Sequence, residues 1–530
     1  MPASRASPRE RRVNDPIAVH ARLERVYRMY VESAFPLRYP SLAGERRAML
    51  SKVGVLAQPP LIEPVPIYPS SGLTLEAAAA ELPEAHKDLG KIAAPLFPDG
   101  RTLYTHQWQA LQASIAGRDV VVTTGTGSGK TEAFMLPLLA SLTAESCGWS
   151  PPETPTADRR WWQGNGDRVS QWQHTSRPHA LRALILYPLN ALVEDQMRRL
   201  RSVLDSPEVS CWVEDERQGN HFTFGRYTGL SPIAGDRTPE KVKRLRAFLR
   251  ERDQEEREVR AALRERGDGS EYHFASLGGG EMWSRWDAQD APPDLLITNY
   301  SMLNIMLMRA IEQGMFEQTR RWLASDPGHV FHLVVDELHA YRGTPGTEVS
   351  YILRLLFERL GLEPNSSQLR ILATSASLEG NDKTFLSEFF GRSPERFEVF
   401  SSPQAPPKRG ADLRAFQGAF SRFAQLNKSP ELLSGVTQIS AESIEALTKK
   451  LWPEAEGESG AERLASALRQ VAVPEALRAA CWSEEGGIRA TPTPTLAQRM
   501  FGVNGEDALR GVLLALGNAR TAGAGALQPV

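Results

Sequence analysis

The stretch Val120–Phe134, VVVTTGTGSGKTEAF, joins a run of valines to a glycine-rich turn and then to an apolar helical pattern. It matches the phosphate-binding consensus GxxxxGK[ST] except at the first position, where Thr124 replaces glycine. Glycines allow backbone N–H groups to converge on an anion, and the N-terminus of a following helix adds positive potential. The stretch therefore predicts a strand, a phosphate-binding turn and a helix.

The turn predicts a site for the phosphates of ATP. Lys130 would reach the β- and γ-phosphates, and the Thr131 hydroxyl would ligate Mg²⁺. A glycine-rich turn without a nucleotide is the alternative, and the strand and helix on either side disfavour it. The candidate ATP-binding residues of the turn are Thr124, Gly125, Thr126, Gly127, Ser128, Gly129, Lys130 and Thr131.

Four more apolar, β-rich runs follow, each separated from the next by helical segments, at 182–188, 294–299, 332–337 and 369–375. Uninterrupted apolar strands that alternate with helices are typical of a parallel sheet with helices on both faces. Ligands of such α/β folds bind at the carboxyl ends of the strands. Each of these runs ends in small, polar or acidic residues, so we expect the chemistry there.

The segment VVDELHA (334–340) places two carboxylates at the end of an apolar strand. Asp336 is suited to ligate Mg²⁺, and Glu337 is suited to act as the base that orients or deprotonates an attacking water. With Lys130, they are the candidate catalytic residues. The alternative is that both acids merely cap a helix. Their order along the chain, after a phosphate-binding loop, favours the catalytic interpretation.

The charge, the cysteines and the apolar runs of the sequence disfavour several classes of protein. The 530 residues carry a net charge of −2, so contact with nucleic acid must use local patches. The three cysteines form no CxxC pair, which disfavours a zinc ribbon and a disulfide framework. The sequence shows no signal-peptide pattern and no apolar run of about 18 residues. We expect a cytoplasmic protein without a membrane partner.

The pattern along the chain predicts three regions. A helical region with a proline-rich connector precedes the α/β domain, and a mainly helical region follows it. Two segments, one rich in Trp, Pro and Gly and one highly charged, interrupt the α/β pattern. The expected bounds are 1–95, 96–400 and 401–530, with insertions near 143–180 and 236–290.

Taken together, the motifs resemble those of superfamily 2 DExH-box helicases. DELH matches the DExH box, LYTHQWQAL (103–111) resembles the Q motif, and TSAS (374–377) resembles the SAT motif with Ser377 in place of Thr. The stretches LYPLNALVEDQ (186–196), RYTGLSP (226–232) and ITNYSML (297–303) resemble the strand-contacting motifs. In detail they are most similar to the Lhr/YprA-like branch and to the large helicases of Druantia- and DISARM-type anti-phage defence systems.

This resemblance implies a RecA-like fold and an ATP- and Mg²⁺-driven helicase or translocase acting on nucleic acid, with DNA as the expected substrate. It implies that Gln107 reads the adenine edge. It also implies that His339, Ser375 and Ser377 couple the ATP site to the strand. The residues implied to contact the strand are Tyr187, Asn190, Thr228, Gly229, Thr298 and Asn299.

The family also uses a second RecA-like domain that supplies arginine fingers, and no such motif follows Ser377. We therefore expect the N-terminal half of a motor, completed in cis or in trans, with defence-system proteins as further partners. The rival hypotheses are an ATP-gated nucleic-acid clamp that never unwinds a duplex, and a scaffold with a vestigial ATP site. The intact Lys130, Thr131, Asp336 and Glu337 disfavour the scaffold.

Overall fold

The computed structural model describes residues 11–97, 100–125, 127–151, 160–188, 190–264, 269–376, 383–402, 404–407, 412–427, 436–484 and 486–519. The chain forms two compact units, one of Tyr68–Pro403 and one that combines Met1–Ile67 with Gln404–Val530. The expected boundary near residue 95 thus differs from the observed one, because residues 75–97 pack into the α/β core. The two helical ends of the chain fold together.

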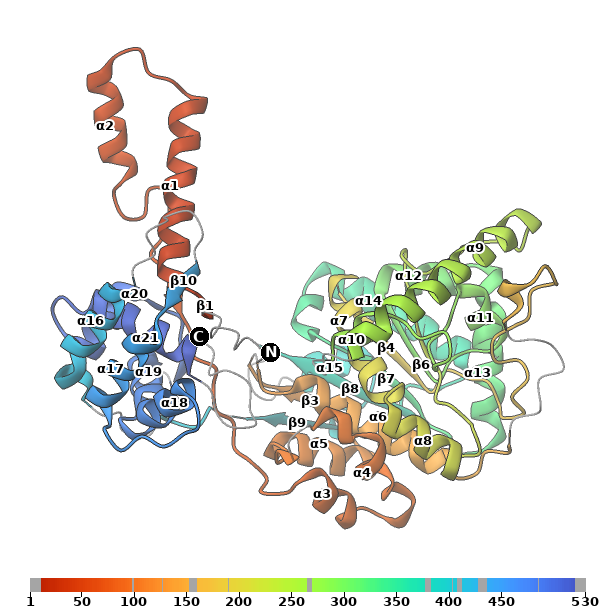
Figure 1. Ribbon diagram of the computed structural model, residues 1–530. Coiled ribbons are helices and arrows are strands. Elements are labelled where there is room, and N and C mark those ends of the chain that lie inside the picture. The colour runs from red at the N-terminus through yellow and green to blue at the C-terminus, as the bar shows by residue number, and fades with distance from the viewer. Residues whose placement is uncertain are drawn as a thin grey trace, which may run out of the picture. The chain divides into compact units, whose positions relative to one another are not determined.

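The unit Tyr68–Pro403 is built on a parallel seven-stranded sheet with strand order β5-β6-β4-β7-β8-β3-β9 (Figure 1). This confirms the predicted α/β class. The strands are β3 (Asp119–Thr123), β4 (Ala183–Tyr187), β5 (Phe224–Tyr227), β6 (Leu295–Asn299), β7 (Phe331–Val335), β8 (Leu369–Ser375) and β9 (Phe397–Ser401).

The apolar runs predict five of these strands, and the other two lie at the sheet edges. Strand β5 has the sequence FGRY, in which a glycine and an arginine interrupt the apolar pattern. Strand β9 has the sequence FEVFS and is only partly buried. Edge strands need fewer apolar residues, so composition alone does not reveal them.

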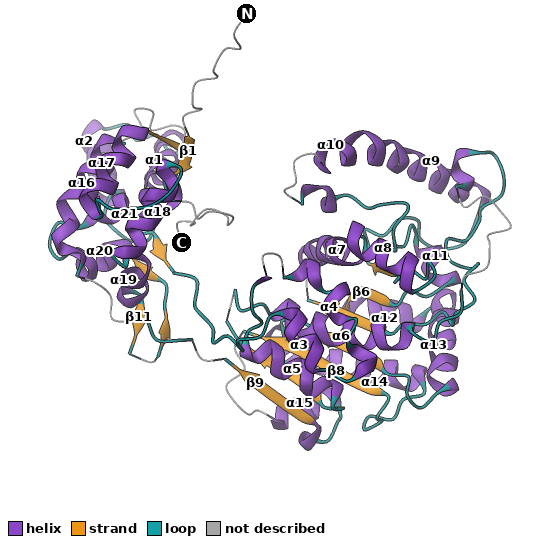
Figure 2. Cartoon of the chain, turned by 60° about the horizontal axis from the view of Figure 1, so that its bottom comes forward, coloured by secondary structure: helices purple, strands orange, loops and turns teal. Residues whose placement is uncertain are grey.

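Helices cover both faces of this sheet (Figure 2). Val120 and Val122 of β3 pack with helices α3 to α8 on one face, and Val121 packs with α12 to α15 on the other. The helices of the unit are α3 (Leu75–Glu81), α4 (Leu89–Ile92), α5 (Thr105–Ile115), α6 (Lys130–Ser146), α7 (Asn190–Leu204), α8 (Pro207–Glu216), α9 (Pro239–Glu255), α10 (Ala261–Arg264), α11 (Arg285–Asp290), α12 (Tyr300–Met308), α13 (Gln313–Ser325), α14 (Thr344–Leu360) and α15 (Lys383–Phe390).

The two insertions pack on each other. Trp161 and Trp162 from the first join Leu245 and Leu249 of the charged helix α9 and Trp286 of α11 in one small core. Burial of large aromatic side chains is a strong stabilising contribution. These tryptophans are therefore structural anchors, and α9 is an attached helix with a solvated outer face.

The second unit is mainly helical. Its core is formed by α16 (Gln417–Leu426), α17 (Ala441–Leu451), α18 (Gly460–Gln470), α19 (Val473–Ala480), α20 (Thr493–Phe501) and α21 (Glu506–Asn518). Strands β1 (Arg11–Asn14) and β2 (Leu61–Ile62) pair with β10 (Val436–Ile439) and β13 (Thr491–Pro492), and β11 (Trp482–Ser483) pairs with β12 (Gly487–Ile488). Helices α1 (Pro16–Ala34) and α2 (Pro40–Leu50) form a hairpin without fully buried residues.

A buried ion pair fastens the start of this unit to its end. Asp15 accepts a hydrogen bond from the backbone N–H of Ala18 and so caps α1, and its other oxygen lies 2.6 Å from Arg510 Nη2 on α21. Among the described helices, none is long and apolar enough to cross a membrane.

Asp205, directly after α7, is a buried carboxyl group with an unusual titration. Its Oδ1 accepts a hydrogen bond of 2.8 Å from Gly280 N–H, whereas Oδ2 has no partner within the described residues. Burial, with a contribution from the negative charge of Glu281, raises the pKa of Asp205 to about 7. Near neutral pH the fold therefore carries the cost of burying a charge.

We expect Asp205→Asn to stabilise the chain at pH 8, on the order of 2 kcal/mol, and much less at pH 5. The folded-state pKa lies above the unfolded value of 3.8, so wild-type stability falls as pH rises through about 7. Thermal unfolding at both pH values measures this, with the exposed Asp236→Asn as control. Equal effects of Asp205→Asn at pH 5 and pH 8 would contradict the assignment.

Candidate functional site

The glycine-rich turn connects β3 to α6 and is shaped by two left-handed residues. Gly127 has φ 74° and Gly129 has φ 70°. A Cβ on Gly129 would lie 2.3 Å from Gln107 Nε2, so a larger residue would displace the end of that side chain and would also be strained by the positive φ. Helix α6 begins at Lys130, which places the loop at the N-terminus of a 17-residue helix. The geometry is that of an anion-binding loop. Thr126 lies outside the described residues.

Helix α5 holds the turn in place. Gln107 Nε2 donates to Gly129 O at 3.0 Å, and its Oε1 accepts from Tyr104 N–H at 2.9 Å. Both ends of the amide are thus engaged within the protein, so reading of adenine by Gln107 stays a prediction. The sequence analysis missed His106, whose Nε2 donates to Ser128 O at 2.9 Å. Burial lowers the pKa of His106, so the neutral ring makes this bond.

The two carboxylates lie at the end of β7, next to the turn. Asp336 is 8% exposed, and burial raises the pKa of its carboxyl group. Glu337 has φ 53°, a left-handed conformation that is strained for a non-glycine residue by about 1–3 kcal/mol. Such strain is concentrated at functional sites because it fixes the direction of a side chain.

Thr374, at the end of β8, is a site residue that the motif comparison did not single out. Its Oγ1 donates to Asp336 Oδ1, which also accepts from Glu337 N–H at 3.0 Å. The next residue, Ser375, is fully buried and accepts from Thr124 N–H at 3.2 Å through its carbonyl. The end of β8 therefore links the acidic strand to the start of the turn. Ser377 lies outside the described residues.

An ion pair joins the turn to the acids. Lys130 Nζ lies 3.4 Å from Glu337 Oε1, and both side chains are largely shielded from solvent. His339 Nδ1 lies 3.3 Å from Glu337 Oε2. The expected coupling of His339 to Ser375 stays a prediction, since the described contact of His339 is with the candidate base.

The donor set fits a magnesium–nucleotide complex. The Thr131 hydroxyl accepts a long bond of 3.5 Å from Gln196 Nε2, and Asp336 supplies a carboxylate directly after β7. Oxygen ligands of this kind suit Mg²⁺, which otherwise keeps water and phosphate oxygens. No cluster of three or more His, Cys, Asp or Glu ligands occurs in the described part of the chain, so a protein-only metal cage is absent there.

The candidate strand-contacting residues follow β4, β5 and β6, which are neighbours in the sheet. Asn190 and Asn299 meet directly, because Asn299 Nδ2 donates to Asn190 Oδ1 at 2.7 Å. Asn299 also caps α12 by accepting from Met302 N–H at 2.8 Å. Gly229 has open space around its Cα, so a ligand can approach its backbone closely.

Three of these residues have buried side chains, so their expected contact with a strand stays a prediction and would run through the backbone. Tyr187 is fully buried, and burial together with the nearby charge of Asp336 raises its pKa. Thr298 is also fully buried and donates to Tyr227 O at 2.7 Å. Thr228 is 1% exposed, and its Oγ1 accepts from Leu230 N–H at 3.3 Å. Their side chains shape the loops, which leaves Asn190, Gly229 and backbone groups as the accessible donors.

The chain is similar in sequence to known helicases and to a protein of a Druantia system. The family model for DEAD/DEAH box helicases matches residues 104–228. Druantia protein DruE of Escherichia coli (strain UMEA 4076-1) is 33% identical over 419 residues, covering 70% of this chain and 21% of that protein. The uncharacterized ATP-dependent helicase YprA of Bacillus subtilis (strain 168) is 23% identical over 282 residues, covering 53% of this chain and 24% of that protein.

The chain thus spans between a fifth and a third of the length of the curated relatives it matches. Among solved structures it is similar to the helicase Lhr of Mycobacterium smegmatis bound to ssDNA and AMP-PNP. The identity is 18% and the TM-score 0.36, over 66% of this chain and 34% of that one. The matched residues include the phosphate-binding turn 124–131, residues 104–111 before it and the stretch 186–196 after it. The chain carries a DEAD/DEAH box helicase domain.

Proposed function

We propose that this chain is the ATP-binding half of a helicase or translocase that moves along a nucleic-acid strand. One observation carries the proposal. The candidate ATP residues follow β3 and β7, beside the end of β8, and the candidate strand residues lie at or just after the ends of β4, β5 and β6. Because the sheet is parallel, both sets lie at the carboxyl ends of its strands. A change at the phosphates would therefore be transmitted to the neighbouring strands over a short path.

The roles of the residues follow from their positions. The turn and the α6 N-terminus would bind the phosphates, with Lys130 exchanging its ion pair with Glu337 for contact with them. Thr131 and Asp336 would hold Mg²⁺, which when bound neutralises charge on the phosphate oxygens. Glu337, released from Lys130 and fixed by its backbone conformation, would accept a proton from water.

We further propose DNA as the substrate and anti-phage defence in the cytoplasm as the setting. The 33% identity to Druantia protein DruE supports the defence setting. Turnover by this half-motor requires a second RecA-like domain that provides arginines to the transition state. The partners proposed are that domain and the other proteins of a defence system.

Substitutions at Lys130 and Glu337 should separate binding of ATP from its hydrolysis. Lys130→Ala removes the phosphate ligand and should weaken ATP binding by at least about tenfold. Glu337→Gln should leave ATP binding intact and reduce hydrolysis by about 10²–10⁴-fold, the usual contribution of a general base. The control is Glu317→Gln, an exposed acid on α13.

Binding of a fluorescent ATP analogue and release of phosphate measure these two steps, with the second domain added where turnover is too slow to detect. Hydrolysis at the wild-type rate by Glu337→Gln would contradict its assignment as the base.

The asparagine pair should matter for strand binding. Asn190→Ala removes an exposed partner of Asn299, and Asn299→Asp keeps the helix cap but adds a negative charge. Asn190→Ala should weaken binding of single-stranded DNA several-fold, because a polar contact is lost. Asn299→Asp should weaken it by about tenfold, because phosphates repel the added carboxylate. Fluorescence anisotropy at several salt concentrations measures the affinity.

A surface asparagine elsewhere is the control for that experiment: Asn365→Ala, in the loop before β8. Unchanged DNA affinity in both site variants would remove these loops from the interface. Strand-separation assays with the complete motor then distinguish the helicase from an ATP-gated clamp. DNA-stimulated hydrolysis without strand separation would favour the clamp.

A further inference from the structure

A cavity lies at the amino ends of the sheet strands, whereas Lys130 lies at their carboxyl ends. Its volume is about 700 Å³, and it is lined from the amino ends of β7 and β8, the C-terminal half of α6 and the end of α5. The motifs discussed above contribute none of its lining residues. In α/β folds the carboxyl edge is the usual ligand site, so this cavity needs a separate explanation.

Arg370 is the one arginine or lysine among the described residues that line this cavity, which also holds Glu145 and Asp326. It is the second residue of β8, and its side chain is only 7% exposed. Its Nη1 donates to Gly117 O, whereas Nε and Nη2 have no hydrogen-bond partner among the described residues. Burial lowers the pKa of Arg370 to about 10, so the side chain stays positive at neutral pH.

Asp119, the carboxylate near Arg370, already pairs with two other arginines. Asp119 Oδ2 lies 2.7 Å from Arg392 Nε and 3.4 Å from Arg396 Nε, and Oδ1 accepts from Ile371 N–H at 2.9 Å. Three guanidinium groups are therefore close to one carboxylate, which leaves an excess of positive charge. A buried cation with unused N–H groups is costly unless an anion pairs with it.

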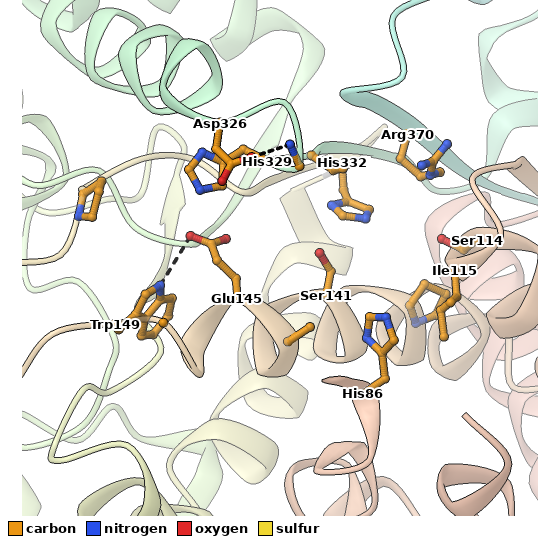
Figure 3. A pocket seen from close by; sticks show the side chains of 16 residues that line it. His86, Ser114, Ile115, Ser141, Glu145, Trp149, Asp326, His329, His332 and Arg370 are labelled. Atoms are coloured by element: carbon orange, nitrogen blue, oxygen red, sulfur yellow. Dashed lines mark hydrogen bonds between the residues drawn. The ribbon is translucent and has the colours of Figure 1, made fainter. Parts of the chain in front are cut away.

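Two serine hydroxyls also line the cavity, those of Ser114 and Ser141. Figure 3 shows Ser114 below Arg370, with Ser141 and His86 rising from the helical side and His332 descending from the strand side. Neither serine hydroxyl has a hydrogen-bond partner in the described part of the chain. Burial lowers the pKa of His332 to about 3, so this ring is neutral and adds no charge. One guanidinium and two hydroxyls form a donor set for a tetrahedral oxyanion.

The two carboxylates at the other end differ in their partners: Glu145 is ion-paired, whereas Asp326 accepts from a backbone N–H. Glu145 lies 2.6 Å from Arg182 Nη2 and also accepts from the indoles of Trp149 and Trp322. Asp326 accepts from Gly328 N–H at 2.7 Å. Trp149 and His329 also line the cavity. Arg177 lies 3.9 Å from the centre of one face of the Trp149 ring, and His329 stacks on Trp322 at 4.7 Å.

From these contacts we infer that the cavity binds a small phosphorylated molecule, with its phosphate on Arg370, Ser114 and Ser141. The volume greatly exceeds that of inorganic phosphate, and the rings at the far end suit a planar organic group such as a nucleobase. The proposal does not depend on the function proposed above, because the lining residues of the two sites do not overlap.

Calorimetric titration with AMP, adenosine and inorganic phosphate tests the proposal. AMP should bind more tightly than adenosine, and Arg370→Gln should weaken AMP binding by at least about tenfold. Ser141→Leu, which fills the cavity from α6, should do the same without removing a charge. Arg321→Gln is the matched control, because that arginine is 74% exposed on α13.

Hydrogen exchange locates the bound AMP and separates this cavity from the phosphate-binding turn. Protection is expected at residues 112–118 and 326–333, and it should persist in Lys130→Ala. Protection confined to residues 127–131, or equal affinity of adenosine and AMP, would overturn the proposal. Circular dichroism of each variant identifies loss of fold. Wild-type affinity for AMP in folded Arg370→Gln and folded Ser141→Leu would also overturn the proposal. Failure of Lys130→Ala to weaken ATP binding would instead count against the proposed function alone.

Discussion

Parallel pairing of β7 with β8, and of β8 with β3, is the constraint on which the candidate site depends. The register places Val335 beside Ala373 and Thr123 beside Ser375. The residues that follow these positions then meet: Asp336 accepts from Thr374, and Thr124 donates its N–H to Ser375 O. Shifting one strand by a single residue would invert its side chains and separate these groups.

The sheet also explains how much of the fold the sequence predicts. Central strands are buried on both faces, so they appear as uninterrupted apolar runs, and all five were predictable. The edge strands β5 and β9 carry arginine, glycine and glutamate and lack that signal. The pairing of the chain's two ends through β1 and β10 was not predictable, because 421 residues lie between Asn14 and Val436 and no local pattern encodes their contact.

The candidate site was predictable to the extent that a motif marks it. Glycines, Lys130 and the acids are recognised by type and spacing, since the phosphate chemistry restricts them. Thr374, His106 and Gln196 act through contacts with those residues, and their partners become visible only with the strand register and helix packing. Burial is likewise a property of the fold: Tyr187 follows the motif pattern, yet its side chain lies in the core.

Tyr187 lies between the candidate ATP site and the candidate strand-contacting loops. It ends β4, which pairs with β7 on one side and with β6 on the other. The nearby charge of Asp336 contributes to the raised pKa of the Tyr187 side chain, and Asn190 follows three residues later in the chain. A buried ring cannot move without disturbing its neighbours, because protein interiors are close-packed. The ring of Tyr187 therefore lies between Asp336 and the loop after β4, and that loop is joined to the loop after β6 by the Asn190–Asn299 hydrogen bond.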